Sequence, residues 1–244
     1  MTDPLPLVSA IIPTYNRPEL LQRAIRSVLD QTYDNIELIV VDDCSPTRLD
    51  NIVQSGSPDT TTDIIFKRHD TNRGVAAARN TGMEVATGEF IAFLDDDDQW
   101  IDSKIATQVQ AFNHADPQVG VVYTESDINR FEDSLPSVRR LSSTNLTKQL
   151  LCKNVVGTPS KVMVRSECVE SAGGFDERFP NWEDQAWYIT LSKQWAFERV
   201  PVRAIKYSQT SPNRASDDFE TLRDEVYHRF IAKFEPLAKQ YGNL

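Results

Sequence analysis

Short apolar runs that stop at acidic or turn residues alternate with helical stretches through the first half of the chain. The apolar runs are residues 8–12, 36–41, 64–66 and 90–94. Between them, residues 19–30 repeat apolar side chains at helical spacing, and residues 75–86 are rich in alanine. Strands that alternate with helices form parallel sheets covered on both faces. We therefore predict an α/β fold with a mostly parallel, Rossmann-like central sheet.

The second half of the chain is less regular. Residues 125–144 are polar and indicate a loop or hairpin, whereas residues 161–164 indicate a strand. Residues 183–194 indicate a helix, and residues 219–241 indicate a long C-terminal helix interrupted at Pro236. The 244 residues, 40% of them hydrophobic, suffice for one sizeable core. Neither a linker nor a repeat divides the sequence, so we expect a single domain.

Charge and cysteine content exclude several classes of protein. A net charge of -10 repels nucleic-acid phosphates, so no nucleic-acid partner is expected, and any anionic ligand needs a metal ion or clustered arginines. The cysteines, Cys44, Cys152 and Cys168, predict neither a disulfide framework nor a zinc site, which fits a cytoplasmic protein. We expect no transmembrane segment, because no stretch reaches roughly 18 apolar residues. Peripheral contact with a membrane stays open.

Polar residues follow the predicted strands where ligands bind in open α/β sheets, outside the carboxyl ends. These residues are 13–16, the pair Asp42 and Asp43, and the run 95–98. No glycine-rich phosphate-binding fingerprint follows any strand. That absence disfavours a dinucleotide oxidoreductase and a P-loop enzyme.

The run from Asp95 to Asp98 is the sharpest chemical feature. Four adjacent carboxylates repel one another, and a cation normally neutralises such a site. The alternative is a solvated acidic turn, and the apolar strand before the run favours a site. An acid at Asp42 or Asp43 could accept hydrogen bonds from a base or ribose, or could belong to a helix-capping turn that includes Ser45.

Two further segments carry candidate groups. Gly74 permits a tight entry into a helix, and Arg79 suits a diphosphate, although an arginine on a packing helix is the alternative. Glu183 and Asp184 open a predicted helix, where an acid could act as a general base or could simply interact with the helix dipole. Trp182 offers a stacking face for a sugar ring, or packs in the core.

The order of these segments resembles glycosyltransferase family 2, whose members have the GT-A fold. The matching segments are VSAIIPTYNR at 8–17, IVVDDCS at 39–45, NRGVAAARNTG at 72–82, GEFIAFLDDDDQW at 88–100, GGFDE at 173–177 and the pair Glu183 and Asp184. Together they cover about residues 7–207. The resemblance implies one domain over 1–244, with a nucleotide-sugar-binding half over about 7–123. It also implies an acceptor and catalytic-base half over about 124–215 and a C-terminal helix over 216–244.

The resemblance also implies roles for individual residues on the donor side. Pro13 and Tyr15 would line the nucleobase pocket, and Asp43 would hydrogen-bond the base, usually uracil. Arg79 corresponds to an arginine near the donor. The metal motif falls on Asp95, Asp96 and Asp97.

Within that motif, Asp97 would be the direct ligand of Mn²⁺ or Mg²⁺, and Asp95 or Asp96 would contact the ribose or the metal. On the acceptor side, Asp184 falls on the catalytic base. The chain departs from the family at Asp96, where a small residue is common, and over residues 207–211, which match the family's basic and aromatic segment only loosely.

The expected function is inverting transfer of a sugar from a nucleoside-diphosphate donor, of which a UDP-sugar is the first candidate. The expected acceptor is a hydroxyl of a glycan, a lipid-linked sugar or a small molecule. A sugar-phosphate nucleotidyltransferase would need a glycine-rich loop after the first strand, and residues 13–17 contain no glycine. A receiver-like module built on Asp42 and Asp43 would need a phosphorylatable aspartate at the third strand end. A nucleotide-sugar-binding protein without turnover remains an alternative.

Overall fold

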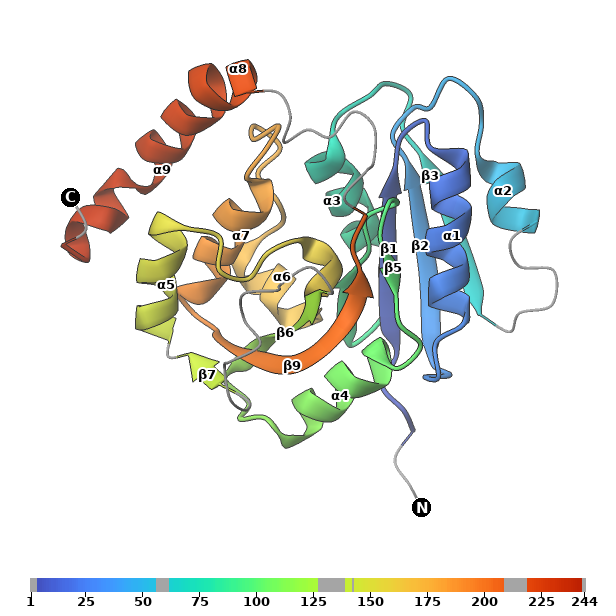
Figure 1. Cartoon of the computed structure of the whole chain (residues 1–244), viewed down its shortest axis with the longest axis horizontal. Helices are drawn as coiled ribbons and strands as arrows, with labels where there is room; N and C mark the ends of the chain where they lie inside the picture. Colours follow the sequence, from blue (N-terminus) through green and yellow to red (C-terminus); the bar gives the residue numbers. More distant parts are fainter. Residues whose placement is uncertain (1–3, 56–61, 127–138, 142, 209–218, 243–244) are drawn as a thin grey trace.

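A single nine-stranded sheet with helices on both faces forms the centre of the molecule (Figure 1). The computed structural model describes residues 4–55, 62–126, 139–141, 143–208 and 219–242. The strands are β1 Val8–Thr14, β2 Ile36–Asp42, β3 Asp63–Arg68, β4 Phe90–Phe93, β5 Gln99–Trp100, β6 Val119–Ser126, β7 Arg139–Leu141, β8 Val162–Arg165 and β9 Ala196–Lys206. Their order in the sheet is β3-β2-β1-β4-β8-β6-β9-β5, and β7 pairs with β9.

The helices occupy most of the connections between strands. They are α1 Pro18–Leu29, α2 Asp50–Ser55, α3 Val75–Val85, α4 Lys104–His114, α5 Ser143–Cys152, the 3-10 turn η1 Pro159–Lys161, α6 Ser166–Ala172, α7 Glu183–Ser192, α8 Phe219–Thr221, the π-helical turn η3 Leu222–Val226 and α9 Tyr227–Gln240. None of the described helices has the length and hydropathy that a membrane-spanning segment requires.

The predicted α/β fold is confirmed, and the parallel order holds where the sequence alternates most regularly. Strands β3, β2, β1 and β4 are parallel neighbours. The register pairs Thr14 with Asp42, so the carboxyl ends of β1 and β2 lie side by side. All residues of β1, β2 and β4 are buried, as expected for strands covered on both faces. The polar residues that follow these strands therefore gather at one edge of the sheet.

Beyond β4 the sheet is mixed rather than parallel. β8 runs antiparallel between β4 and β6, whereas β6 and β9 are parallel. β9 escaped sequence detection because polar residues such as Glu198, Arg199 and Arg203 interrupt its apolar pattern. Antiparallel neighbours need no crossover helix, so strand–helix alternation could not reveal this half of the sheet.

The polar stretch 125–144, predicted as a loop or hairpin, has regular structure at both ends: it begins inside β6, contains β7, and includes the start of α5 at Ser143. Residues 127–138 and 142 of the stretch lie outside the described part of the chain. The C-terminal helix is not interrupted at Pro236, because α9 runs through it. A proline removes one helical hydrogen bond. Burial of Phe230 and Phe234 against the core offsets that loss.

Two apolar cores lie on opposite faces of the sheet, since adjacent residues of a strand point to opposite faces. In β1, Ile11 belongs to one core, and Ala10 and Ile12 belong to the other. The Ile11 core packs against α3, α5, α6, α7 and α9, and the other packs against α1 and α4. In Figure 1 these two groups of helices flank the sheet on its two sides. Trp182 packs edge-on against Phe230, with ring centroids 5.5 Å apart, so it contributes to the core.

One buried residue works against stability. The Lys104 side chain is fully buried, its Nζ lies 3.8 Å from the Trp100 ring centroid, and it has no hydrogen-bond partner among the described residues. Burial lowers the pKa of Lys104 well below 10.5. A desolvated cation–π contact is worth about 2 kcal/mol, less than the several kcal/mol that burying an ammonium costs. The N-terminus of α4 also disfavours positive charge. Folding therefore favours the neutral form of this amine.

The variant Lys104→Met should be more stable than the wild type at pH 7, by about 1–3 kcal/mol. Between the lowered pKa of the folded state and the unfolded value of 10.5, only the unfolded chain binds this proton. Wild-type stability should therefore rise with pH relative to the variant, by up to about 1.4 kcal/mol per pH unit. Urea unfolding at several pH values measures both effects, with the exposed Lys153→Met as the control. Equal pH dependence of both proteins would contradict this assignment.

Candidate active site

The first acid of the Asp95–Asp98 run is held by an arginine and a threonine hydroxyl. Asp95 Oδ1 lies 2.7 Å from Arg79 Nη2, and Asp95 Oδ2 accepts a hydrogen bond of 2.8 Å from Thr158 Oγ1. The backbone amide of Asp95 donates to Ser160 Oγ at 3.1 Å. Asp95 is therefore fixed between α3 and the turn that precedes η1.

The next two acids share one arginine. Asp96 accepts hydrogen bonds from Thr14 Oγ1 at 2.8 Å and from Arg17 Nη1 at 3.0 Å. Asp97 Oδ2 lies 3.4 Å from the same Arg17 nitrogen, and its side chain is 14% exposed. Burial raises the pKa of Asp96 to about 6, although Arg17 opposes the shift. Asp97 therefore makes weaker contacts with its neighbours than Asp96 does.

The fourth acid joins the run to the end of β9. Asp98 is buried, and its Oδ1 accepts the backbone amide of Ser208 at 3.1 Å. Its Oδ2 has no hydrogen-bond partner among the described residues. Burial, with a further contribution from Asp95, raises the pKa of Asp98 to about 7.

These acids fit a cation that brings most of its own ligands. Within the described residues, no three His, Cys, Asp or Glu side chains are arranged to hold a metal ion. Asp97 is partly exposed beside Asp96, and both oxygens of Asp95 and of Asp96 already accept hydrogen bonds. A magnesium-like ion is often bound by one or two carboxylates plus phosphate and water oxygens. The arrangement suits that kind of ion.

At the end of β1, the two residues expected at the nucleobase differ in exposure. Pro13 is buried, whereas Tyr15 is 45% exposed. Asn16 has a positive φ of 53°, and its amide donates to Ser45 Oγ at 2.7 Å. Ser45 Oγ in turn donates to Asp42 at 2.5 Å, which ties the end of β1 to the end of β2. An exposed aromatic ring at this edge is suited to stacking on a base.

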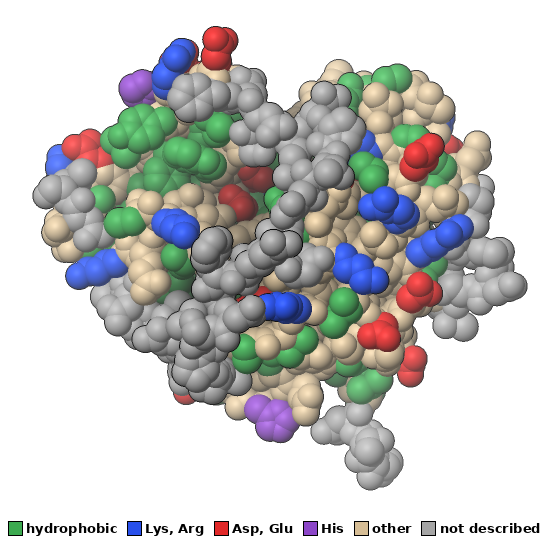
Figure 2. All heavy atoms as spheres, viewed as in Figure 1, with side chains coloured by type: hydrophobic (Ala, Val, Ile, Leu, Met, Phe, Trp, Pro, Cys, Tyr) green, Lys and Arg blue, Asp and Glu red, His purple; other side chains and the backbone are tan. Residues whose placement is uncertain are grey.

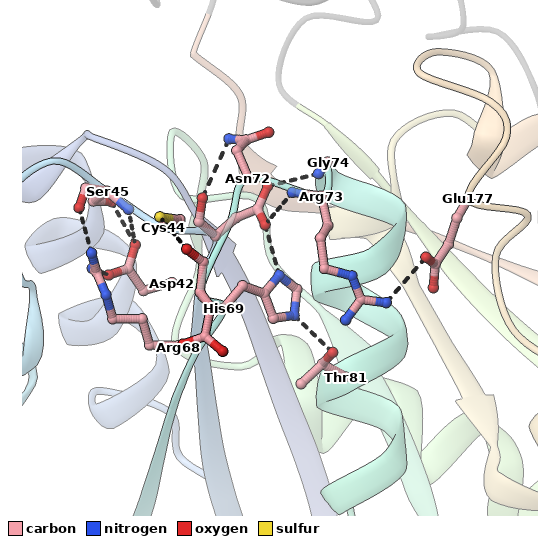
Figure 3. Close-up of polar contacts among 12 residues, drawn as sticks. Asp42, Cys44, Ser45, Arg68, His69, Asn72, Arg73, Gly74, Thr81 and Glu177 are labelled. Atoms are coloured by element: carbon pink, nitrogen blue, oxygen red, sulfur yellow. Dashed lines mark hydrogen bonds and ion pairs between the residues drawn. The ribbon is translucent and has the colours of Figure 1, made fainter.

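Asp43 organises the entry into α3, and Figure 3 shows its partners His69, Arg73 and Gly74 beside the start of that helix. Its Oδ1 accepts the backbone amide of Arg73 at 2.8 Å, and its Oδ2 accepts that of Gly74 at 2.8 Å. His69 Nδ1 lies 2.7 Å from the same Oδ1, and His69 Nε2 lies 2.9 Å from Thr81 Oγ1. Gly74 has a φ of 89°, a backbone conformation that would be strained in a residue with a side chain. The predicted contact with a base stays a prediction, since a carboxylate oxygen can accept a second hydrogen bond.

Arg79 on α3 links the acid run to the start of α7. Its Nη2 pairs with Asp95 at 2.7 Å and its Nη1 pairs with Glu183 at 2.7 Å. The side chain is only 3% exposed, and the guanidinium lies 5.2 Å from the Phe175 ring centroid. Arg79 therefore joins the acid run to the start of α7, which its position in the sequence could not reveal.

Asp184, the predicted base, lies in the first turn of α7. Its Oδ2 accepts a hydrogen bond of 2.9 Å from Asn154 Nδ2, and its Oδ1 accepts the amide of Gln185 at 2.6 Å. Burial, followed by the charge of Glu183, raises the pKa of Asp184 to about 7. A carboxylate with that pKa is well matched to proton transfer at neutral pH.

The segment 173–177 reaches the site through contacts that sequence reasoning missed. Asn80 on α3 exchanges hydrogen bonds with the backbone of Phe175, at 2.8 and 2.9 Å. Glu177 accepts from Asn80 at 3.0 Å and pairs with Arg73 at 3.2 Å. A Cβ at Gly174 would lie 2.3 Å from Asn80 Oδ1, which explains the glycine. One face of α3 thus holds the loop that leads into α7.

The sheet edge and the start of α7 therefore form one site. The acid run, Arg79 and Glu183 are joined by ion pairs, and Asp184 follows Glu183 directly. Figure 2 shows acidic side chains inside a hollow of the surface, bordered by apolar side chains on the side of α9. Such a hollow, with carboxylates of raised pKa, has the character of an enzyme site.

Comparison with known proteins identifies the family. The family model described as Glycosyl transferase family 2 matches residues 9–172. The Escherichia coli protein WfgD, named as a UDP-Glc:alpha-D-GlcNAc-diphosphoundecaprenol beta-1,3-glucosyltransferase, is 43% identical over 96% of this chain and 90% of its own length. An uncharacterised glycosyltransferase of Haemophilus influenzae is 27% identical over 90% of this chain and 74% of its own length. The putative colanic acid biosynthesis glycosyl transferase WcaA of E. coli is 36% identical over 56% of this chain, and the match spans about half of the length of WcaA.

Solved structures show the same fold. The mannosyltransferase PcManGT from Pyrobaculum calidifontis, in complex with GDP-Man and Mn²⁺, has a TM-score of 0.73 at 23% identity, over 95% of this chain and 64% of that chain. TarS 1-349 of S. aureus with UDP-GlcNAc has a TM-score of 0.70 at 20% identity, over 87% and 61% of the two chains. The chain therefore belongs to glycosyl transferase family 2 and is a glycosyltransferase with the GT-A fold.

Proposed function

We propose that this enzyme transfers glucose from UDP-glucose to a hydroxyl of a lipid-diphosphate-linked N-acetylglucosamine, with inversion at the anomeric carbon. The observation that carries the donor and acceptor classes is the likeness to WfgD, which extends over nearly the full length of both chains. A donor that carries its glucose in α linkage can give a β product by a single displacement at that carbon. The proposal therefore requires one base and one charged leaving group, and both have candidates in the site.

Asp184 is the proposed general base. It takes the proton from the acceptor hydroxyl as that oxygen attacks the anomeric carbon. Asn154 holds one oxygen of Asp184 at 2.9 Å and orients the carboxylate. The Asp184 carboxyl, with a pKa of about 7, can carry a negative charge before the reaction and hold a proton after it.

On the donor side, Tyr15 and Pro13 are proposed to border the base, and Asp43 is proposed to accept a hydrogen bond from it. Asp95 or Asp96 is proposed to contact the ribose or the metal. Asp97 would hold Mn²⁺ or Mg²⁺, which would neutralise charge that develops on the departing diphosphate. Arg79 is proposed to support this region by fixing Asp95 and Glu183, with which its two terminal nitrogens pair.

Transfer from radiolabelled UDP-glucose to a synthetic α-N-acetylglucosaminyl diphosphate lipid tests the proposal. We expect a radiolabelled lipid product that depends on Mn²⁺ or Mg²⁺, and much less product from GDP-mannose or UDP-galactose at equal concentration. The same acceptor without its lipid shows whether the lipid is required. Transfer from another nucleotide sugar alone would refute the glucose donor, and slow hydrolysis of the donor without transfer would refute the acceptor.

A further inference from the structure

Arg17 is the charged neighbour of the two carboxylates that face the proposed cation. It follows β1 and stands at the N-terminal boundary of α1. Its Nη1 lies 3.0 Å from Asp96 Oδ1 and 3.4 Å from Asp97 Oδ2. The Arg17 side chain is 24% exposed.

A divalent cation on Asp97 would meet this guanidinium at short range. Both are positive, and both are attracted by the same pair of acids. Like charges a few ångströms apart in a partly buried site repel strongly, because the effective dielectric constant there is well below that of water. The cation alone should therefore bind weakly while Arg17 keeps its place.

A diphosphate changes this balance. Its negative charges can lie beside both cations, screen their repulsion and offer the guanidinium oxygen acceptors in the geometry that arginine prefers. Arg79 cannot play this part, because it is 3% exposed and both of its terminal nitrogens are bound to carboxylates. Arg17, by contrast, is 24% exposed beside the two carboxylates that face the proposed cation.

We infer that Arg17 couples the two ligands of the donor site, so that the divalent cation binds tightly only together with the nucleoside diphosphate. The inference rests on the proposed function, since it assumes that Asp97 holds the cation. In the donor-free enzyme, Arg17 neutralises Asp96 and Asp97 and keeps the acid run in its folded arrangement. In the donor complex, Arg17 faces the diphosphate.

Titration calorimetry with Mn²⁺, in the absence and presence of saturating UDP, measures the coupling. For the wild type we expect Mn²⁺ to bind about tenfold or more tightly when UDP is present, and UDP to gain the same factor from Mn²⁺. Arg17→Met should bind Mn²⁺ alone about tenfold or more tightly than the wild type does, and the gain from UDP should shrink accordingly. Arg23→Met, an exposed change of equal charge on α1, should match the wild type.

Arg17→Lys separates charge from folding, because it keeps the positive charge. It should bind Mn²⁺ alone as weakly as the wild type does. An unchanged affinity of Arg17→Met for Mn²⁺ alone would overturn the inference, and so would tight binding by Arg17→Lys. Both results leave binding of UDP with Mn²⁺ to the wild type intact. Failure of the wild type to bind UDP with any divalent cation would instead overturn the proposed function.

Discussion

Replacing Asp184 with asparagine is expected to lower kcat by about 10²- to 10⁴-fold, which is the usual contribution of a general base. Asparagine has nearly the same shape, and its one side-chain oxygen can still accept the backbone amide of Gln185, while the hydrogen bond from Asn154 Nδ2 is lost. Binding of UDP-glucose should therefore change little, because Asp184 acts on the acceptor. Single-turnover kinetics and calorimetry with UDP measure the two quantities separately.

The pH profile gives this assignment a second readout. Since burial raises the pKa of Asp184 to about 7, wild-type kcat/KM should increase as pH rises through about 7 and the carboxylate loses its proton. The residual activity of Asp184→Asn should not show that increase. Glu170→Gln, the same chemical change at an exposed position of α6, should behave as the wild type. A variant that loses donor affinity but keeps its kcat would show that Asp184 serves the donor instead.

Replacing Asp97 with asparagine should make UDP binding insensitive to Mn²⁺ and Mg²⁺. An amide carries no negative charge and is a poor ligand for a hard cation, while the fold loses only a contact of 3.4 Å to Arg17. Since metal stabilisation of a leaving group is worth several kcal/mol, kcat should fall by about 10²-fold or more. Calorimetry with UDP, with Mn²⁺ or with EDTA, measures the binding effect.

Asp102→Asn is the matched control, because Asp102 is exposed and lies five residues further along the chain. It should keep the full response of UDP binding to Mn²⁺. If Asp97→Asn also keeps that response, the cation is held elsewhere in the acid run. Asp98, whose Oδ2 has no hydrogen-bond partner among the described residues, would then be the first candidate.

The sequence was sufficient to predict the strands and the edge of the sheet where the site lies, because both follow from local apolar runs and the polar residues after them. The buried strands β1, β2 and β4 read as apolar runs, and the residues that follow them gather at one edge because parallel strands end together. The resemblance to the family therefore placed Asp97 and Asp184 in segments that the structure joins into one site. Their chemical roles stay predictions that the experiments above test.

The sequence was insufficient where a side chain finds its partner across the fold. Arg79 looked like a ligand for a diphosphate, yet its charge is engaged by Asp95 and by Glu183, which is 104 residues away. Asp43, which the resemblance assigns to the base, also accepts the backbone amides of Arg73 and Gly74, a contact across the fold that the sequence did not indicate. Partners so distant in sequence leave no periodic signal, and nothing in the spacing predicts them.

Residues 207–211 loosely match the family's basic and aromatic segment, and the sequence did not indicate what they contact in the fold. Only Tyr207 and Ser208 belong to the described part of the chain, and the amide of Ser208 binds Asp98. Residues 209–211 and residues 216–218 of the expected C-terminal region lie outside it. The contact nevertheless places the end of β9 against the acid run, which no motif in that stretch indicated.

The most direct test of a single displacement at this site is the configuration of the first product formed. Proton NMR of the glucosylated acceptor, recorded within the first few per cent of conversion from α-linked UDP-glucose, reports that configuration through the coupling constant of the new anomeric proton. A β-linked product is predicted, with Asp184 as the only carboxylate that must lose a proton to start the reaction. An α-linked product would contradict the account, because retention needs a second displacement or a front-face route that leaves Asp184 without its assigned role.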